Sequence, residues 1–241
     1  MTATHHIRYS ATTHVGLKRQ VNEDAILALP ELGIWLVSDG MGGHEAGDYA
    51  SRLIADAVAT LPEGMSPIQT RQAVDDALQT SHGLIRAEAG RRDKGTIGAT
   101  VVSFMVAEGH FLCFWAGDSR LYRFRHGESI EMLTTDHSVV AAFVESGQMS
   151  WDEAELHPQS NAITRAVGVG ETLELDMIRG EILPGDRFLI CSDGLTKYAT
   201  FDILQRAMNH TPIEIVADKL LQIALDGGGG DNISVIVVDV I

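Results

Sequence analysis

Four aspartates stand at the edges of short apolar runs, and this arrangement constrains the fold more than any other feature of the sequence. They are Asp39, Asp118, Asp193 and Asp231, and a carboxylate pair, Glu23-Asp24, precedes the apolar run 25–29. The runs are short, β-branched or aromatic and bounded by glycine, which predicts buried strands. Carboxylates gathered at buried strand ends repel one another unless a cation lies among them. The pattern therefore favours divalent metal ions held by carboxylate oxygens.

Composition limits the number of domains and the classes of partner. A chain of 241 residues, 45% hydrophobic and 21% charged, fits a globular protein with a sizeable core. The formal net charge of −15 argues against nucleic acid and anionic membrane surfaces as partners. Cys113 and Cys191 lie inside apolar runs, a pattern typical of reduced thiols in the cytoplasm. With no signal pattern and no long apolar run, we expect a cytoplasmic monomer without membrane insertion.

The order of the predicted elements indicates an α+β fold. Strand runs 100–107 and 110–116, and then 121–125 and 129–133, are joined by short turns, which predicts antiparallel pairs. Amphipathic patterns predict helices over 48–61, after a Ser66–Gln69 capping box, and after a Thr211-Pro212 start; a terminal strand is expected over 233–240. Because strict β-α-β alternation is missing, antiparallel sheets covered by helices are favoured over a doubly wound parallel sheet.

Taken singly, each glycine-rich or basic motif also has an ordinary explanation. The stretch 39–43 lacks the ending of a P-loop and the spacing of a dinucleotide loop, so it is either a tight turn or a place where the Gly40 carbonyl approaches a metal. The glycine run 227–230 fits a flexible connector. Arg19 fits either a surface salt bridge or bidentate binding of phosphate.

Taken together and in this order, the motifs resemble the PPM, or type-2C, family of metal-dependent protein serine/threonine phosphatases, in its compact bacterial branch. The series is Arg19-x-x-Asn22-Glu23-Asp24, Asp39-Gly40-Met41-Gly42-Gly43, Gly117-Asp118-Ser119-Arg120, Asp136-His137-Ser138, Ser192-Asp193-Gly194-Leu195 and Gly230-Asp231-Asn232-Ile233-Ser234. It runs from about Thr13 onward. The resemblance implies a single catalytic domain over 1–241, built as an antiparallel two-sheet β-sandwich flanked by helix pairs in four α-β-β-α layers. Residues 1–6 are expected to be disordered, and 139–165 to form a flap.

The resemblance also implies two to three Mn²⁺ or Mg²⁺ ions, for which hard oxygen ligands are suited. Asp39 would bridge two metals, and a metal-bridging hydroxide would attack phosphorus in line. The carbonyl of Gly40 would ligate one of the two metals. Asp193 and Asp231 would hold one metal, Asp24, with Glu23 nearby, would support the other through waters, and Asp118 with Asp193 would form a third, weaker site. Arg19 matches the clamp for the substrate phosphate.

The general acid is less constrained by the resemblance. Eukaryotic members carry a histidine where this chain has Met41, and His44 is a candidate for protonating the leaving alkoxide. A surface role for His44 fits equally well, and His137 is expected to hold a turn or a helix start. Cys113 and Cys191 fit no nucleophile, because each lies in a buried strand without basic neighbours.

The main hypothesis is hydrolysis of phosphoserine and phosphothreonine in proteins, opposing a bacterial Ser/Thr kinase in signal transduction. One alternative is a catalytically inactive regulator that binds phosphoproteins; the complete set of aspartates argues against it. Another keeps the fold and acts on a phosphorylated anti-sigma antagonist or a small phosphate ester. The flap is expected to select the substrate, since loops on rigid scaffolds carry recognition.

Overall fold

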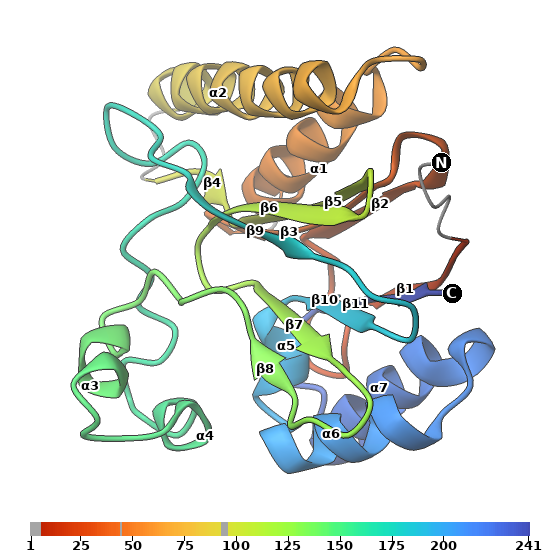
Figure 1. Cartoon of the computed structure of the whole chain (residues 1–241). Helices are drawn as coiled ribbons and strands as arrows, with labels where there is room; N and C mark the ends of the chain where they lie inside the picture. Colours follow the sequence, from red (N-terminus) through yellow and green to blue (C-terminus); the bar gives the residue numbers. More distant parts are fainter. Residues whose placement is uncertain (1–5, 44, 93–95) are drawn as a thin grey trace.

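Two antiparallel sheets lie face to face in the middle of the molecule (Figure 1). A computed structural model describes residues 6–43, 45–92 and 96–241. One sheet has the order β1-β11-β10-β7-β8, with bounds Ile7–His14, Ile233–Val240, Arg187–Cys191, Arg120–Phe124 and Glu131–Met132. The other has the order β2-β3-β5-β6-β9, with bounds Asp24–Leu29, Ile34–Met41, Val101–Ala107, His110–Ala116 and Asp176–Glu181. The short β4 (Gly98–Ala99) also pairs with β3.

Side-chain alternation along the strands builds the core between the sheets. On β3, Trp35 and Val37 point into the space between the sheets, whereas Ile34 and Leu36 face the helices. Phe104 and Phe188 come from opposite sheets, and their ring centroids are 4.6 Å apart. A strand buried on both faces must be apolar at nearly every position, which explains the continuous runs in the sequence.

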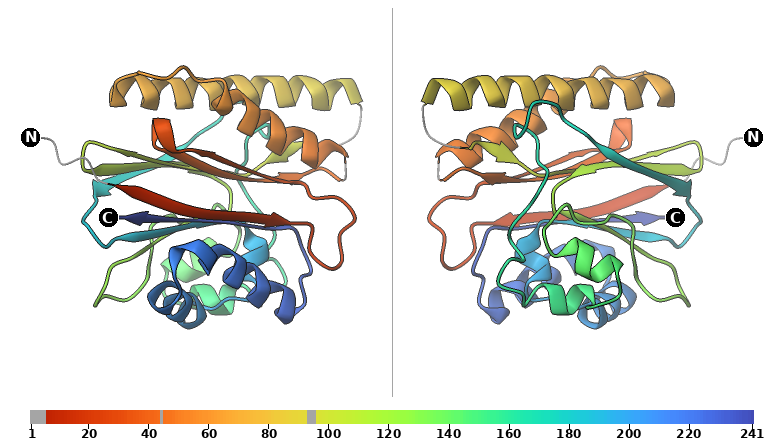
Figure 2. Two further views of the ribbon diagram at one scale, coloured as in Figure 1. Left: turned by 90° about the vertical axis from the view of Figure 1, so that its right-hand side faces the viewer. Right: turned by 90° about the vertical axis from the view of Figure 1, so that its left-hand side faces the viewer.

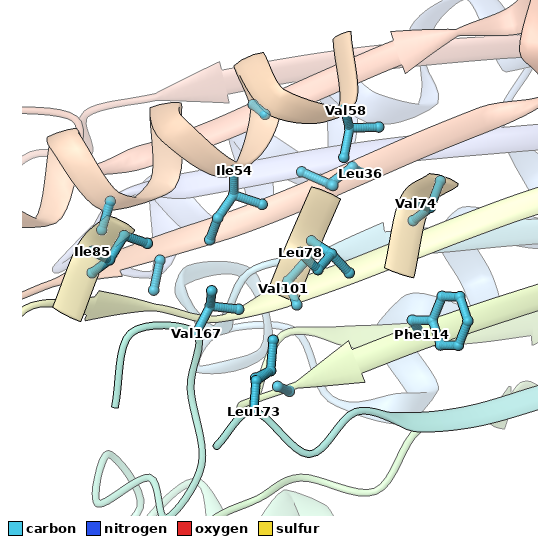
Figure 3. Packing of buried hydrophobic residues seen from close by; sticks show 14 of the residues in the cluster. Leu36, Ile54, Val58, Val74, Leu78, Ile85, Val101, Phe114, Val167 and Leu173 are labelled. Atoms are coloured by element: carbon cyan, nitrogen blue, oxygen red, sulfur yellow. The ribbon is translucent and has the colours of Figure 1, made fainter. Parts of the chain in front are cut away.

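Helices cover both outer faces, so the molecule has four layers (Figure 2). Helices α1 (Glu45–Ala59) and α2 (Pro67–Arg92) cover the β2-β3-β5-β6-β9 sheet through a cluster of aliphatic side chains (Figure 3). Helices α5 (Asp193–Thr196), α6 (Phe201–His210) and α7 (Ile213–Gly227) cover the other sheet. The predicted α+β sandwich with flanking helices is therefore confirmed.

The segment 139–165 leaves the sandwich and returns to it. It carries α3 (Ala141–Glu145) and α4 (Trp151–Ala154). A backbone hydrogen bond from Val139 N–H to the Ala162 carbonyl, at 2.9 Å, closes the base of this segment. Outside this segment, a 3-10 turn, η1 (Pro30–Leu32), connects β2 and β3. The Ser150 capping box at α4 is present as the sequence predicts. We keep the name flap for residues 139–165; its status as a separate unit stays a prediction.

Several element predictions need adjustment. The hairpin β5–β6 and the Ser66–Gln69 box are confirmed, whereas the strand expected over 129–133 is only two residues long. Thr211 does not cap α7: the N-cap residue is Pro212, and the buried Thr211 hydroxyl has no hydrogen-bond partner among the described residues. Helix α6 and strand β9 were not predicted. Of the residues expected to be disordered, 1–5 lie outside the described residues, and His6 accepts a bond from Ile241 N–H.

No helix in the described part of the chain is both long and apolar enough to cross a membrane.

Candidate metal centre

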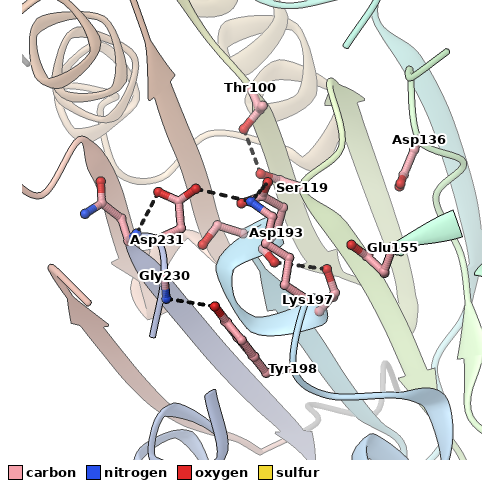
Figure 4. A network of polar contacts seen from close by, with 12 residues as sticks. Thr100, Ser119, Asp136, Glu155, Asp193, Lys197, Tyr198, Gly230 and Asp231 are labelled. Carbon is pink, nitrogen blue, oxygen red and sulfur yellow. Dashed lines mark hydrogen bonds and ion pairs between the residues drawn. The ribbon is translucent and has the colours of Figure 1, made fainter. Parts of the chain in front are cut away.

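The predicted aspartates meet at one end of the sandwich, although they come from positions far apart in the sequence. Four of them, Asp39, Asp118, Asp193 and Asp231, line a cleft of about 560 Å³. The fifth, Asp24, is buried beside them, and its Oδ2 accepts a 2.8 Å hydrogen bond from the Ser192 hydroxyl. The five aspartates therefore form one carboxylate cluster, and Figure 4 shows two of them, Asp193 and Asp231, with their polar contacts.

Strand pairing explains why the carboxylates converge. Asp24 opens β2 and stands directly opposite Asp39 in the antiparallel register of β2 and β3. Asp193 follows the end of β10, and Asp231 lies two residues before the neighbouring β11. Asp118 occupies the turn that carries the chain from one sheet to the other, between β6 and β7. These ends lie at the same edge of the two sheets, so their side chains share one space.

The cluster is electrostatically costly as it stands. Burial, and then the neighbouring Asp24 and Asp193 carboxylates, raise the pKa of Asp39 well above its usual range. Burial and then Asp193 do the same to the pKa of Asp118. Burial raises the pKa of Asp24 to about 7, although hydrogen bonds from the Ser234 and Ser192 hydroxyls lower it. A cation placed among such buried carboxylates would stabilise their charged form.

Two basic side chains already contact the cluster. The Arg19 guanidinium reaches both oxygens of Asp231, with Nε 2.9 Å from Oδ1 and Nη2 3.0 Å from Oδ2. The Lys197 ammonium lies 2.7 Å from Asp193 Oδ2 and 3.1 Å from Asp231 Oδ2. Burial alone would lower the pKa of Lys197, but the two carboxylates raise it, so the side chain stays charged. Lys197 was missed in the sequence, although its spacing four residues after Asp193 on a helical segment is a recognisable ion-pair signal.

The donor set fits divalent metal ions in its chemistry. The ligands are hard oxygens, and the Oδ1 atoms of Asp24 and Asp193 are buried without a hydrogen-bond partner. Orphaned buried carboxylate oxygens are what a bound cation would satisfy. As the side chains stand, however, no group of three His, Cys, Asp or Glu residues within 6–43, 45–92 and 96–241 is arranged to hold an ion. Asp193 and Asp231 contact the basic side chains of Lys197 and Arg19.

Gly40 lies where only a glycine fits. Its N–H donates to the Glu23 carbonyl at 3.1 Å, and a Cβ at this position would lie 2.2 Å from the Gly47 carbonyl oxygen. The close packing holds the backbone of Gly40 at the cleft, which it lines. Its role as a carbonyl ligand stays a prediction.

Asn232 ties the Arg19 loop to the Asp231 loop, and the sequence motifs did not reveal this role. Its Nδ2 donates to the carbonyls of Val15 and Val21, at 2.9 and 3.0 Å, while its Oδ1 accepts from Glu23 N–H at 2.7 Å. A Cβ on Gly16 would lie 2.0 Å from the Asp231 carbonyl oxygen, so the two loops touch backbone to backbone. The buried amide therefore holds Arg19 against Asp231.

A buried arginine, paired with two acids, anchors the flap beside the centre. Arg120 at the start of β7 donates to both oxygens of Asp136, at 2.9 and 2.7 Å, and lies 2.8 Å from Glu155 Oε1 of the flap. Its guanidinium also stacks 5.1 Å from the ring centroid of Trp151. Asn161 and Ile163 of the flap reach the cleft itself. The flap thus forms one wall of the site.

Of the two histidines considered in the sequence analysis, only His137 lies within the described residues. His44, the candidate general acid, lies outside the described residues. His137 holds a turn, as expected: its Nδ1 accepts from Gly117 N–H at 3.1 Å, immediately before Asp118. Its ring stacks on Trp115 at a centroid distance of 6.0 Å, and burial lowers its pKa. His137 therefore positions the Asp118 turn.

The four-layer sandwich and the aspartate-lined cleft with an arginine at its rim define the class of metal-dependent phosphatases that share this fold. Residues 13–223 match the family described as Protein phosphatase 2C, and the chain belongs to that family. The predicted resemblance is thereby confirmed.

Named bacterial proteins resemble this chain over nearly its whole length. The serine/threonine protein phosphatase PstP of Mycobacterium tuberculosis is 34% identical over 236 residues, which are 98% of this chain and 45% of that protein. The chain thus spans about half the length of this relative. The solved structure of PppA, described as a key regulatory component of T6SS in Pseudomonas aeruginosa, is 41% identical, with a TM-score of 0.89 and 98% of each chain covered. The catalytic domain of PstP, solved with two manganese ions, has a TM-score of 0.83, 32% identity and 98% coverage of each chain.

Proposed function

We propose that this chain is a metal-dependent phosphatase that hydrolyses phosphoserine and phosphothreonine in proteins. The observation that carries the proposal is the convergence of five aspartates from both sheets: four line one cleft with Arg19 at its rim, and Asp24 is buried beside them. Membership of the Protein phosphatase 2C family and the manganese-bound relative support it.

The aspartates and Arg19 would have different roles in the hydrolysis. Mn²⁺ or Mg²⁺ bound at the aspartates would activate water and polarise the phosphoryl oxygens. Asp39, Asp193 and Asp231, with the Gly40 carbonyl, would hold two of these ions, and Asp24 would support one of them through waters. Asp118 with Asp193 would hold a third, more weakly bound ion. Arg19 offers a planar guanidinium to the equatorial phosphate oxygens, where negative charge develops. Because Arg19 is half exposed, it can turn from Asp231 to a substrate that enters the cleft.

A cysteine nucleophile does not fit this protein. Cys113 and Cys191 are both buried and free, and burial raises the pKa of each thiol. A buried neutral thiol is a poor nucleophile, so covalent catalysis through either residue is disfavoured. The carboxylate cluster is therefore the site that accounts for hydrolysis.

Hydrolysis of p-nitrophenyl phosphate and of a phosphothreonine peptide tests the proposal. We expect Mn²⁺- or Mg²⁺-dependent release of phosphate that EDTA abolishes and that Asp39→Ala removes. Asp218→Ala, an exposed aspartate of α7, is the matched control and retains activity. Activity that persists in EDTA would contradict the two-metal chemistry. Binding of phosphopeptide without hydrolysis under any metal would favour the inactive regulator instead.

The biological setting extends the same proposal. We infer a cytoplasmic monomer that reverses the action of a Ser/Thr kinase in a signalling pathway, because the buried thiols suit a reducing compartment. The PppA likeness supports regulation of a secretion system as one such pathway. A phosphorylated anti-sigma antagonist is the competing protein substrate. A panel of phosphoproteins of each type, compared by kcat/KM, separates these possibilities.

A further inference from the structure

Lys197 occupies a position in the cleft that the predicted metal ligands would otherwise share. Its Nζ lies between Asp193 Oδ2 and Asp231 Oδ2, at 2.7 and 3.1 Å, as Figure 4 shows from close by. The side chain is 19% exposed, and its partners are 14% and 22% exposed. This ion pair is therefore largely shielded from solvent and bridges two carboxylates rather than one.

The surrounding helix holds Lys197 at this place. Lys197 directly follows α5 as its C-cap residue, and its N–H donates to the Asp193 carbonyl at 3.1 Å. The next residue after Asp193, Gly194, packs tightly against the loop before β11, since a Cβ there would lie 1.8 Å from the Asn232 carbonyl oxygen. The backbone positions of the lysine and of both carboxylates are thus set by the same close contact between α5 and the loop before β11.

A lysine here changes the local charge balance. Asp193 and Asp231 carry two negative charges that repel each other and the rest of the cluster, and the ammonium offsets one of them. A divalent cation that binds both carboxylates must take over the contacts of the ammonium. The stem of Lys197 is flexible and the residue lines the cleft, so the ammonium can withdraw into the cleft when this happens.

We propose that Lys197 is a resident competitor for the divalent cation at the Asp193–Asp231 pair, which lowers the affinity of this site and sets the metal concentration at which it fills. The inference rests on the metal centre of the proposed function. It makes Lys197 a residue that controls metal occupancy rather than a catalytic residue. In the metal-free protein the same ammonium stabilises the carboxylate pair.

Metal binding itself, rather than turnover, tests the proposal. Protein stripped with EDTA and dialysed would be titrated with Mn²⁺, with free ion followed by electron paramagnetic resonance and heat by calorimetry. Removing a close unit charge of the same sign as the ion is expected to tighten Mn²⁺ binding about tenfold or more in Lys197→Gln. In EDTA, the same variant is expected to unfold at a lower temperature than the wild type.

Two further variants isolate the effect of the contact. Lys18→Gln removes one positive charge from the same cleft, at an exposed residue that lines it, and should change the affinity by less than about twofold. Lys197→Met keeps the aliphatic stem and should tighten binding as Lys197→Gln does, which guards against loss of affinity through misfolding.

The outcomes separate this proposal from the proposed function. Unchanged or weaker Mn²⁺ binding in both folded Lys197 variants would overturn the competitor role, even if the wild type hydrolyses phosphopeptides. Tighter binding in the variants supports the role, even if no phosphatase activity is found. Absence of Mn²⁺ binding by every protein, wild type included, would overturn the competitor role together with the metal centre.

Discussion

Asp24 and Asp39 are direct cross-strand partners in the antiparallel β2–β3 pair. Like charges in this position destabilise a sheet, by about 0.2–1 kcal/mol for an exposed pair and more when desolvated. A sheet that keeps such a pair where the paired strands reach the cleft is stabilised when protons or cations neutralise it. The relationship links the stability of the fold to occupancy of the site.

Replacing one member of this pair should therefore stabilise the metal-free protein. In EDTA at pH 8, Asp39→Asn is expected to raise the unfolding temperature by about 2–4 °C, since roughly 1 kcal/mol corresponds to that shift for a chain of this size. The same variant should lose the stabilisation that Mn²⁺ gives the wild type. Differential scanning fluorimetry with and without Mn²⁺ measures both effects. A lower unfolding temperature in EDTA would show that Asp39 is not under electrostatic strain.

The metal-free protein should also lose stability as the pH rises. Burial, and then the charges of Asp193 and Asp231, raise the pKa of Asp24 to about 7, against about 3.9 in an unfolded chain. Between these values the folded state holds a proton that the unfolded state has released, so the free energy of unfolding falls with increasing pH. Urea titrations at pH 5, 6, 7 and 8 in EDTA check the slope. Asp24→Asn should flatten it, and a wild-type stability that rises over this range would contradict the assignment.

Asn232 should matter for both stability and substrate affinity. Asn232→Ala leaves two carbonyls and one N–H without their partner, and each unsatisfied buried group costs about 1–3 kcal/mol. We expect a loss of about 3 kcal/mol in urea unfolding, and a raised KM for phosphopeptide because the Arg19 loop is no longer held. Asn232→Asp retains the acceptor but turns an oxygen toward both carbonyls and adds a charge beside the aspartates, so it should destabilise at least as much as the alanine variant. A change below about 0.5 kcal/mol for the alanine variant would mean that water replaces the amide.

The buried Arg120 cluster should be needed to keep the flap in place. Arg120→Ala leaves Asp136 and Glu155 as unpaired buried acids, and breaking a buried pair costs about 3–5 kcal/mol. Limited proteolysis should then cleave within the flap faster than in the wild type. The matched control is Arg123→Ala, whose partner Glu131 is 53% exposed; its cost should stay below about 1 kcal/mol. Equal effects of the two variants would contradict an anchoring role.

The sequence was sufficient to predict the features that are written in local patterns. Carboxylates at strand ends, the β5–β6 hairpin and the Ser66–Gln69 capping box depend on residues close together in the chain, and each of these elements is confirmed. The α+β architecture followed from the order of these elements. The exact ligand geometry and the role of Arg19 remain predictions.

The features that escaped prediction depend on contacts between distant residues. Asn232 acts through bonds to Val15 and Val21, over 200 residues away, and nothing beside it in the sequence indicates them. Thr211 has a good local capping pattern, but its carbonyl accepts from the distant Arg187, and α7 begins after Pro212 without a side-chain cap. Lys197 had a local signal in its spacing from Asp193, and only its second partner, Asp231, needed the structure.

The position of β11 has a consequence for how the protein is made. This strand lies between β1 and β10, and it is the element that brings Asp231 and Asn232 to the cleft. On the ribosome, the loop that carries Arg19 emerges more than 200 residues before these partners. A nascent chain can therefore form its first hairpins and helices early, yet the carboxylate centre is completed only when β11 leaves the exit tunnel and inserts beside β1. The carboxylate centre can therefore act only after β11 has been synthesised and has joined its sheet.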